Sequence, residues 1–201
     1  MASSEPEGSV LEASFFDRDT TVVARDLLGK VLVRELNGQR LWGRLVEVEA
    51  YLGPDDLAAH SKGGRRTSRT EVMFGPPGHA YIYFTYGMHW CLNFVTREKG
   101  VPQAVLVRAL EPGPGVGRCS GPGLLTRALS LNGAQNGLPL QPPDLYVIDD
   151  HEPKRRVFVT PRIGVQGTGR WEKRRLRYVV DSPLLSRPIP RALRPAARRR
   201  V

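Results

Sequence analysis

Strand-like segments joined by very short turns are the feature that most constrains the fold of this chain. Residues 30–36 and 39–51 flank Asn37-Gly38, a dipeptide that readily adopts the positive φ angles of a tight hairpin turn. Two residues can join antiparallel strands, whereas parallel strands need a crossover of a dozen or more. The sequence therefore excludes a doubly wound parallel sheet and predicts a largely antiparallel one.

A second hairpin is predicted over His79–Val95, where two runs rich in aromatic and β-branched residues flank Tyr86-Gly87-Met88. A tip carrying Tyr86 and Met88 places bulky apolar groups in water, which marks an interaction surface or a wedge. Aromatic residues in strands usually serve packing, so a buried central hairpin is the alternative interpretation.

The size and charge of the chain restrict its class. Its 201 residues suffice for one domain with a sizeable core, and 30 Lys and Arg against 20 Asp and Glu give a net charge of +10. This excess predicts attraction to nucleic acid or to an anionic membrane surface. No apolar run approaches the roughly eighteen residues of a membrane span, and the first ten residues lack a secretory signal. We therefore expect an intracellular protein.

One domain between two loose ends is the expected organisation. Residues 1–13 are polar and acidic and are expected to form a flexible leader. Residues 185–201 are rich in proline and arginine and are expected to form a disordered basic tail. Residues 14–184 would then form the single domain.

Several short elements are expected inside this domain. Asp19 or Thr20 can cap a helix that ends at Gly29, a usual stop signal. The other expected elements are strands over 103–110, 145–148 and 156–159, a helix over 124–131, and a strand or helix over 173–180.

Two carboxylates and an arginine are candidates for a polar site. Glu47 and Glu49 lie on one face if their strand stays regular, although carboxylates at strand ends are more often solvated. Arg108 is the one charge inside the apolar run 103–110. A buried arginine needs an anion partner, because an unpaired one costs several kcal/mol. Glu49 on an adjacent strand is the candidate partner.

A basic loop follows the first hairpin. Residues 62–66, KGGRR, and Arg69 combine glycines, which let backbone N–H groups approach phosphate, with arginines that supply charge. We interpret this loop as a phosphate contact, and a solvated charged loop is the alternative. His60 precedes it, and a lone histidine is more often structural than functional.

Metal and nucleotide chemistry are not indicated. Cys91 and Cys119 lie far apart without a metal-type spacing and are expected to be reduced thiols. The chain contains neither a GxGxxG motif nor a Walker loop, so a phosphotransferase is not supported. We expect no cofactor and no metal.

Five separated blocks resemble a known protein family. In order, they are EVEAYLGPDDLAAHSKGGRRT, YIYFTYGMHWCLN, VLVRALEP, SGPGLLTRALSLN and PRIGVQGTGRWEKRRLRYVV. They look like the alkyladenine (3-methyladenine) DNA glycosylases of the animal and bacterial type, over roughly residues 15–180. The chain departs from the animal members in a shorter region between Glu111 and Cys119, in His89-Trp90 and in its arginine-rich C-terminus.

The resemblance implies a catalytic pair. Glu49 matches the general base that deprotonates the attacking water, and Arg108 matches the arginine that helps hold this water. A backbone carbonyl near residues 163–165 is implied as a further acceptor for the water. Because the resemblance places a glutamate with a water, and no lysine amine, at the attacking position, we expect a monofunctional enzyme that leaves the strand uncut.

The resemblance also implies which residues contact the base. Tyr51, His60 and Tyr83 match the walls between which a flipped base stacks. Asn93 matches a side chain that disfavours normal guanine by crowding its amino group. A tyrosine and histidine slot attracts a base that carries a positive charge, by about 0.5 to 2 kcal/mol.

Contacts to the DNA itself are implied at the hairpin tip and in the basic loop. Tyr86 matches the side chain that enters the minor groove and fills the gap left by the flipped nucleotide. Met88 shares this tip, and Arg65 falls where the family contacts DNA phosphate. The expected partner is double-stranded DNA with a damaged purine and not a membrane, and the protein is expected to be a DNA-associated monomer.

The implied fold is α+β, a single mixed domain with a curved, mostly antiparallel sheet, short helices and a protruding β-hairpin. The implied function is base excision repair, in which the enzyme flips 3-methyladenine, hypoxanthine or a related purine from duplex DNA and hydrolyses its N-glycosidic bond, leaving an abasic site. Two alternatives stay open: a non-catalytic module that stacks on single-stranded nucleic acid, and a protein-interaction domain whose basic charge is incidental.

Overall fold

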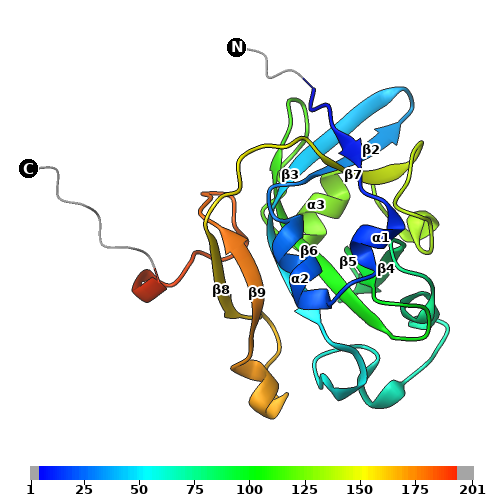
Figure 1. Cartoon of the computed structure of the whole chain (residues 1–201), viewed down its shortest axis with the longest axis vertical. Coiled ribbons are helices and arrows are strands. Elements are labelled where there is room, and N and C mark those ends of the chain that lie inside the picture. Colours follow the sequence, from blue (N-terminus) through cyan, green and yellow to red (C-terminus); the bar gives the residue numbers. More distant parts are fainter. Residues whose placement is uncertain (1–4, 194–201) are drawn as a thin grey trace, which may run out of the picture.

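The computed structural model describes residues 5–193, in which β-strands and short helices are mixed along the chain (Figure 1). The strands are β1 (Ser9–Val10), β2 (Val31–Leu36), β3 (Gln39–Tyr51), β4 (Ala80–Thr85), β5 (His89–Thr96), β6 (Gln103–Pro112), β7 (Leu145–Asp149), β8 (Val157–Pro161) and β9 (Arg175–Val180). The α-helices are α1 (Ala13–Phe16), α2 (Thr20–Leu27) and α3 (Pro122–Ala128). Short 3-10 turns lie at Gly53–Asp55, Lys62–Gly64, Glu71–Phe74, Gly133–Gln135, Gly169–Glu172 and Arg191–Leu193.

The described strands form one curled sheet in the order β1-β7-β2-β3-β6-β5-β4, and β8 and β9 extend it beside β3. Every strand pair in this sheet is antiparallel. The predicted fold class is therefore confirmed, and so are both predicted hairpins, β2–β3 and β4–β5. The turn at Asn37-Gly38 has positive φ angles at both residues, as a tight turn requires.

Strand β3 is the centre of the sheet. One of its edges pairs with β6, while the other edge pairs first with β2 and then, over Glu47–Glu49, with β9. The register between β3 and β6 shifts on both sides of Glu47, so that Val46 and Arg108 have no paired residue. Such bulges re-aim side chains, and here they lie where the charged residues of β3 and β6 meet.

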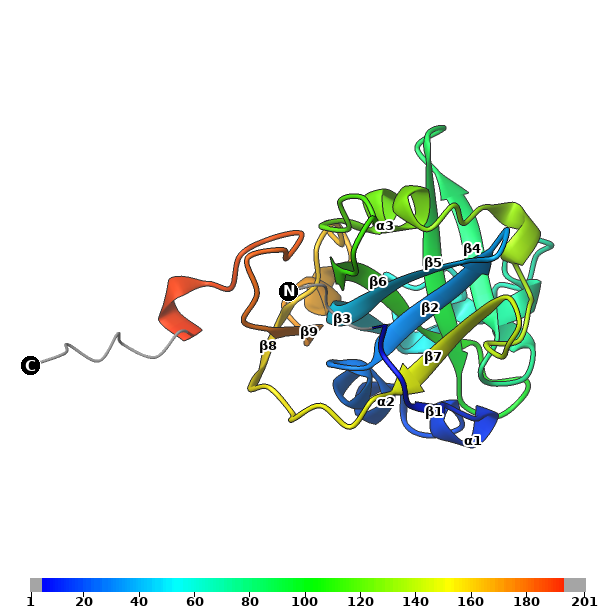
Figure 2. The ribbon, with the colours of Figure 1, turned by 90° about the horizontal axis from the view of Figure 1, so that it is seen from above.

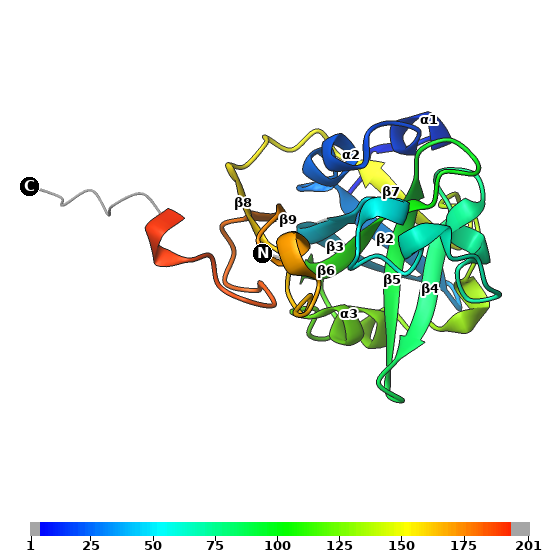
Figure 3. The same ribbon diagram turned by 90° about the horizontal axis from the view of Figure 1, so that it is seen from below.

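The helices cover opposite sides of the sheet. Figures 2 and 3 show α1 and α2 on one side and α3 on the other, the side from which the β4–β5 hairpin projects. The predicted cap of α2 is confirmed, because the Asp19 carboxylate accepts hydrogen bonds from the Thr21 and Val22 N–H groups. Helix α3 runs over Pro122–Ala128 and not over 124–131, since proline is favoured in the first turn and Ser130 has a φ of 52°.

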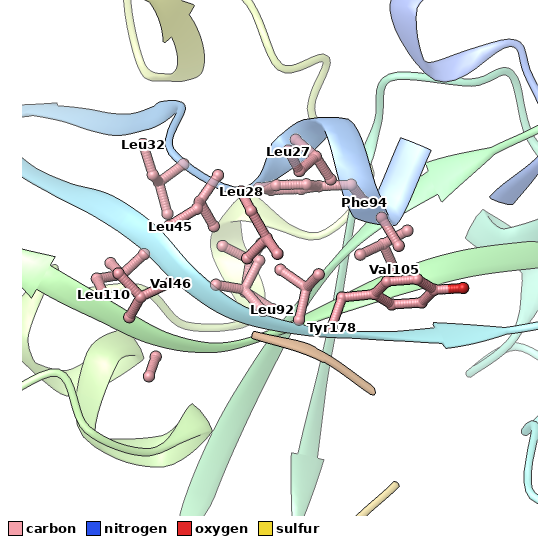
Figure 4. Close-up of a cluster of buried hydrophobic side chains, with 14 of the residues drawn as sticks. Leu27, Leu28, Leu32, Leu45, Val46, Leu92, Phe94, Val105, Leu110 and Tyr178 are labelled. Carbon is pink, nitrogen blue, oxygen red and sulfur yellow. The ribbon is translucent and has the colours of Figure 1, made fainter. Parts of the chain in front are cut away.

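The core lies largely between α2 and the sheet. Leu27 of α2 packs in one cluster with apolar side chains of β3, β5 and β6, and Phe94 of β5 belongs to the same cluster (Figure 4). Both side chains are fully buried. Helix α2 thus holds β3 in place from the side opposite the hairpin.

Part of each end that the sequence predicts to be loose is packed against the domain in the structure. Ser9–Val10 pair with β7 and Leu11 is buried, so the leader predicted over 1–13 is wrong from residue 9 onward. The tail predicted from residue 185 is wrong at its start, because Leu185 and Ile189 are buried in the core. Residues 1–4 and 194–201 lie outside the described residues. Within residues 5–193, no helix is both long and apolar enough to cross a bilayer.

We expect Leu27→Ala to lower the free energy of unfolding by about 2–5 kcal/mol, because it leaves a cavity in a core that cannot fully collapse. Denaturant unfolding followed by circular dichroism measures this change. Val22→Ala on the same helix is the control, since Val22 is 45% exposed and its truncation should change stability by at most about 0.5 kcal/mol. Equal losses in the two variants would contradict the packing described for α2.

Candidate active site

A cavity of about 440 Å³ opens beside the β4–β5 hairpin, between β3, β6 and the loop after β8. Its size is that of a typical small-molecule site. Six of the nine predicted site residues line this cavity: Tyr51, His60, Tyr83, Tyr86, Asn93 and Arg108. The structure thus brings together residues that are spread over nearly sixty positions of the chain.

Glu49 lies directly behind the cavity wall. Its side chain is fully buried, and its hydrogen-bond partners all line the cavity. Oε2 accepts from the Tyr51 hydroxyl at 3.0 Å and from Arg108 Nη1 at 3.3 Å, which confirms the predicted pairing of Glu49 with Arg108. Oε1 accepts from the Ile163 N–H at 2.8 Å. The contact found in the 163–165 segment is therefore an N–H donor that fixes the carboxylate.

The surroundings of Glu49 make it a stronger base than an ordinary carboxylate. Burial raises the pKa of Glu49, and the charge of Glu47 raises it further, whereas Arg108, the Ile163 N–H and Tyr51 lower it. Arg108 lowers the pKa of Glu49, as the sequence indicates, but the effect of desolvation is larger and the pKa is raised overall. A carboxyl group with a raised pKa accepts a proton from water more readily once it is ionised.

Three aromatic side chains form a continuous surface in the cavity. The ring centroids of His60 and Tyr83 are 4.5 Å apart in an edge-to-face arrangement, and those of Tyr81 and Tyr83 are 5.4 Å apart. His60 Nδ1 lies 2.9 Å from the Tyr81 hydroxyl. Tyr81 is not among the predicted site residues, although its position two residues before Tyr83 on one strand places both side chains on the same face.

His60 is uncharged at neutral pH. Burial lowers its pKa to about 4, and the nearby charge of Arg69 acts in the same direction. The Arg69 guanidinium lies over the Tyr83 ring, 4.9 Å from its centroid. A neutral imidazole in this wall would not repel a positively charged base.

A fully buried ion pair fixes the position of Tyr51. Arg162 donates to both carboxylate oxygens of Asp56, at 2.6 and 2.8 Å, and to the Ala50 carbonyl at 3.0 Å. Its guanidinium also stacks on Tyr51, 4.5 Å from the ring centroid. This pair ties the chain after β3 to the loop that carries Ile163. The partners are 106 residues apart, so no local sequence pattern announces the pair.

Asn93 is a rigid polar group in the cavity wall. It is buried on β5, and its Nδ2 donates to the Tyr81 carbonyl at 3.0 Å. This hydrogen bond fixes the orientation of the amide plane. A fixed amide can discriminate between planar ligands by the polar groups on their edges.

The tip of the β4–β5 hairpin is exposed, whereas its base is buried, with Tyr81 and Phe94 in the core. The alternative of a buried hairpin is therefore right for the base and wrong for the tip. Tyr86 is 86% exposed and Met88 is 67% exposed. Tyr86 has a φ of 52°, a left-handed conformation that costs a non-glycine residue about 1–3 kcal/mol. Tyr86 lines the main cavity, whereas Met88 lines a second hollow of about 350 Å³ next to α3.

Neither Arg65 nor Arg69 of the basic loop lines the cavity, but Arg69 contacts Tyr83 of the cavity wall. Arg69 contacts Tyr83 and donates to the Phe84 carbonyl at 3.4 Å. Arg65 is exposed and does not line the cavity. Its neighbour Arg66 is engaged by Glu71 at 2.6 and 2.8 Å. Arg65 thus remains accessible to a ligand approaching from solvent.

The cysteines are free thiols, as the sequence predicts. Cys91 and Cys119 are both buried, and Cys91 lines the cavity opposite Tyr83 on the neighbouring strand. Among residues 5–193, no group of three or more His, Cys, Asp or Glu side chains is arranged to hold a metal ion.

Comparison with known proteins gives consistent matches. Residues 14–183 match the family model described as "Methylpurine-DNA glycosylase (MPG)". A relative from Anaeromyxobacter dehalogenans is 47% identical over 185 residues, covering 90% of this chain and 88% of its own length. One from Legionella pneumophila (strain Corby) is 45% identical over 180 residues, covering 88% and 98%. Both carry the name "Putative 3-methyladenine DNA glycosylase".

The antiparallel fold, the carboxylate behind an aromatic cavity and these relatives define a DNA glycosylase, a DNA-repair hydrolase that cleaves N-glycosyl bonds. The chain belongs to the methylpurine-DNA glycosylase family. The match covers the whole cavity, since each of its lining residues falls within residues 14–183.

We expect His60 to stay neutral until the pH falls to about 4, because burial disfavours its charged form. An NMR titration of the histidine ring resonances measures this pKa, with His60→Asn assigning the signal. The unfolded chain protonates near pH 6.5, so His60 should also make the folded state less stable as the pH falls from 6.5 towards 4. A His60 resonance that titrates near 6.5 would show that the ring is solvated.

Proposed function

We propose that this protein is a monofunctional glycosylase that flips alkylated or deaminated purines out of duplex DNA and hydrolyses their N-glycosidic bonds, leaving abasic sites. The observation that carries the proposal is the placement of a buried carboxylate directly behind an aromatic cavity, with an exposed tyrosine at the mouth of the same cavity. The exposed tyrosine would open the duplex, the aromatic cavity would hold the base, and the carboxylate would drive cleavage of the N-glycosidic bond.

Flipping requires a group that replaces the extruded nucleotide. Taking a base out of the stack costs a few kcal/mol, which an inserted side chain helps to offset. Tyr86 is almost fully exposed at the end of a hairpin that projects from the domain, and it also borders the cavity. A side chain in this position can occupy the gap in the duplex while the nucleotide enters the cavity beside it.

The cavity suits a planar base that carries a positive charge. Tyr51 and the surface formed by His60, Tyr81 and Tyr83 offer ring faces on which such a base can stack. Alkylation at a ring nitrogen makes the base cationic, and a ring face favours it by about 0.5 to 2 kcal/mol. Deaminated bases such as hypoxanthine are neutral, and they would be selected by weaker pairing in the duplex and by the edge contacts of Asn93.

Glu49 would perform the hydrolysis. Departure of the base leaves an oxocarbenium-like sugar, and an ionised carboxylate can both stabilise that charge and take a proton from the attacking water. Burial strengthens Glu49 as a base, while Arg108 beside it can hold the water. The cavity lining among the described residues contains no lysine, which supports a water nucleophile and an intact DNA strand.

Double-stranded DNA with a damaged purine is therefore the proposed partner. We also propose that the protein is a monomer and is associated with DNA in the cell. The net charge of +10 supports this partner, because the phosphate backbone attracts basic proteins at every sequence. Arg65 in the exposed basic loop is the proposed phosphate contact, and Met88 is a second apolar contact at the hairpin tip.

We expect Glu49→Gln to bind damaged duplex DNA normally and to lose base excision by about 100-fold or more, because a neutral amide cannot accept the proton of water. The assay incubates protein with methylated duplex DNA or with a duplex that contains one hypoxanthine, and measures free base. Strand breaks should form only after alkali treatment, as a monofunctional enzyme requires. Glu35→Gln, which neutralises a carboxylate paired with Arg40 on the far hairpin, is the matched control. Wild-type excision by Glu49→Gln would refute the assigned role.

We expect Tyr86→Ser to weaken binding to duplex DNA with a lesion and to leave binding to single-stranded DNA almost unchanged, because only a duplex has a gap to fill. Fluorescence anisotropy with the two labelled DNA forms measures the difference. Val22→Ser, an exposed apolar site on the opposite side of the sheet, is the control. Equal weakening on both DNA forms would argue against a wedge and in favour of a single-strand binding module.

A further inference from the structure

Glu47 is a fully buried carboxylate next to the proposed base, and the mechanism above assigns no step to it. It accepts four hydrogen bonds. Oε1 accepts from Arg177 Nε at 2.7 Å, from Arg108 Nε at 3.1 Å and from the Ser186 hydroxyl at 2.6 Å, and Oε2 accepts from the Ser186 N–H at 2.6 Å. A buried carboxylate with this many charged and polar partners is held in one orientation.

Arg108 depends on Glu47 for its position. It has no paired residue across β3, so the sheet register alone does not set its direction. Its planar guanidinium spans the two carboxylates, with Nε on Glu47 at 3.1 Å and Nη1 on Glu49 at 3.3 Å. The Ser186 hydroxyl adds contacts of 3.3 Å to Nε and Nη2.

The chain around Ser186 forms the outer support of this arrangement. We call residues 182–189 the C-terminal strap. Leu185 and Ile189 anchor it in the core, and Arg177 donates to the carbonyl of Arg187. Ser186 lies beyond the end of the region that matches the family model, residue 183. The strap thus brings a segment of the chain outside that region into contact with the proposed active site.

We propose that Glu47 is a positioning residue of the active site and that the C-terminal strap completes the site, because Ser186 and Glu47 together hold the Arg108 guanidinium against Glu49. This inference rests on the proposed function. The Arg108 guanidinium is shared between two carboxylates. Arg108 can then orient Glu49 and its water while lowering the pKa of Glu49 less than an unshared guanidinium would.

Removing the charge of Glu47 should make Glu49 a weaker base. The charged and titratable groups that act on Glu49 directly are Glu47 and Tyr51 on β3 and Arg108 on β6. Arg177 on β9 is paired with Glu49 in the sheet and donates to Glu47, and Arg162 in the loop after β8 stacks on Tyr51. A neutral residue at position 47 removes a like charge and leaves Arg108 to act on Glu49 alone. Both effects lower the pKa of Glu49, so the acid limb of the excision profile should move to lower pH.

Glu47→Gln tests this inference in single-turnover excision across pH. We expect the plateau rate to fall by about 10- to 100-fold, the acid limb to move to lower pH and the affinity for damaged duplex DNA to stay unchanged. Glu35→Gln should match the wild type in all three respects, since Glu35 has comparable partners, Arg40 and Tyr146, away from the cavity. An unshifted acid limb would reduce Glu47 to a structural role and overturn the inference.

Ser186→Ala is the milder second variant, for which a folded protein is expected even if Glu47→Gln melts at a much lower temperature. We expect it to slow excision by roughly 3- to 10-fold at unchanged DNA affinity, because it removes one hydroxyl from the Glu47 and Arg108 contacts. Ser120→Ala, which removes a hydroxyl bonded to Arg118, is the control.

The outcomes separate the two proposals. Wild-type protein that releases no base would overturn the proposed function. Active wild type, with Glu47→Gln equal to Glu35→Gln or with Ser186→Ala equal to Ser120→Ala, would overturn only the positioning role.

Discussion

The sharing of Arg108 between Glu47 and Glu49 is the interaction on which the site depends. Two carboxylates cannot be buried side by side as anions without cations close to them, because desolvation and mutual repulsion each cost several kcal/mol. Arg108 and Arg177 supply that charge from the strands on either side. The cluster therefore combines two acidic and two basic side chains. Within it, burial raises the pKa of Glu49 while Arg108 lowers it.

The sheet topology creates this cluster. Only β3 is paired with β6 on one edge and with both β2 and β9 on the other. The second half of β3 therefore has a strand on each side where Glu47 and Glu49 lie. The bulge opposite Arg108 brings the Arg108 side chain to both carboxylates. The same half of β3 ends at Tyr51, so the proposed base and one stacking face come from a single short run of sequence. The hairpin then adds Tyr83, Tyr86 and Asn93 from the next strands.

The sequence predicts well those features that rest on local signals. The Asn37-Gly38 turn, the Asp19 cap and the exposed hairpin tip each follow from a few neighbouring residues, and the pairing of Arg108 with Glu49 follows from the cost of burying a lone charge. Features made by distant residues are not predictable in this way. Asp56 and Arg162 form a buried pair across 106 residues, and Ser186 reaches Glu47 from a segment whose proline and arginine content indicates disorder.

The central claim is that a damaged nucleotide leaves the duplex and enters this cavity while Tyr86 fills its place. A crystal structure of the protein bound to a duplex with one hypoxanthine nucleotide, made resistant to hydrolysis by a 2′-fluoro group, tests it most directly. The account predicts the base against Tyr51 and Tyr83, its sugar facing Glu49, and the Tyr86 ring inside the duplex. A hypoxanthine still stacked in the helix, with the hairpin tip away from the DNA, would contradict it.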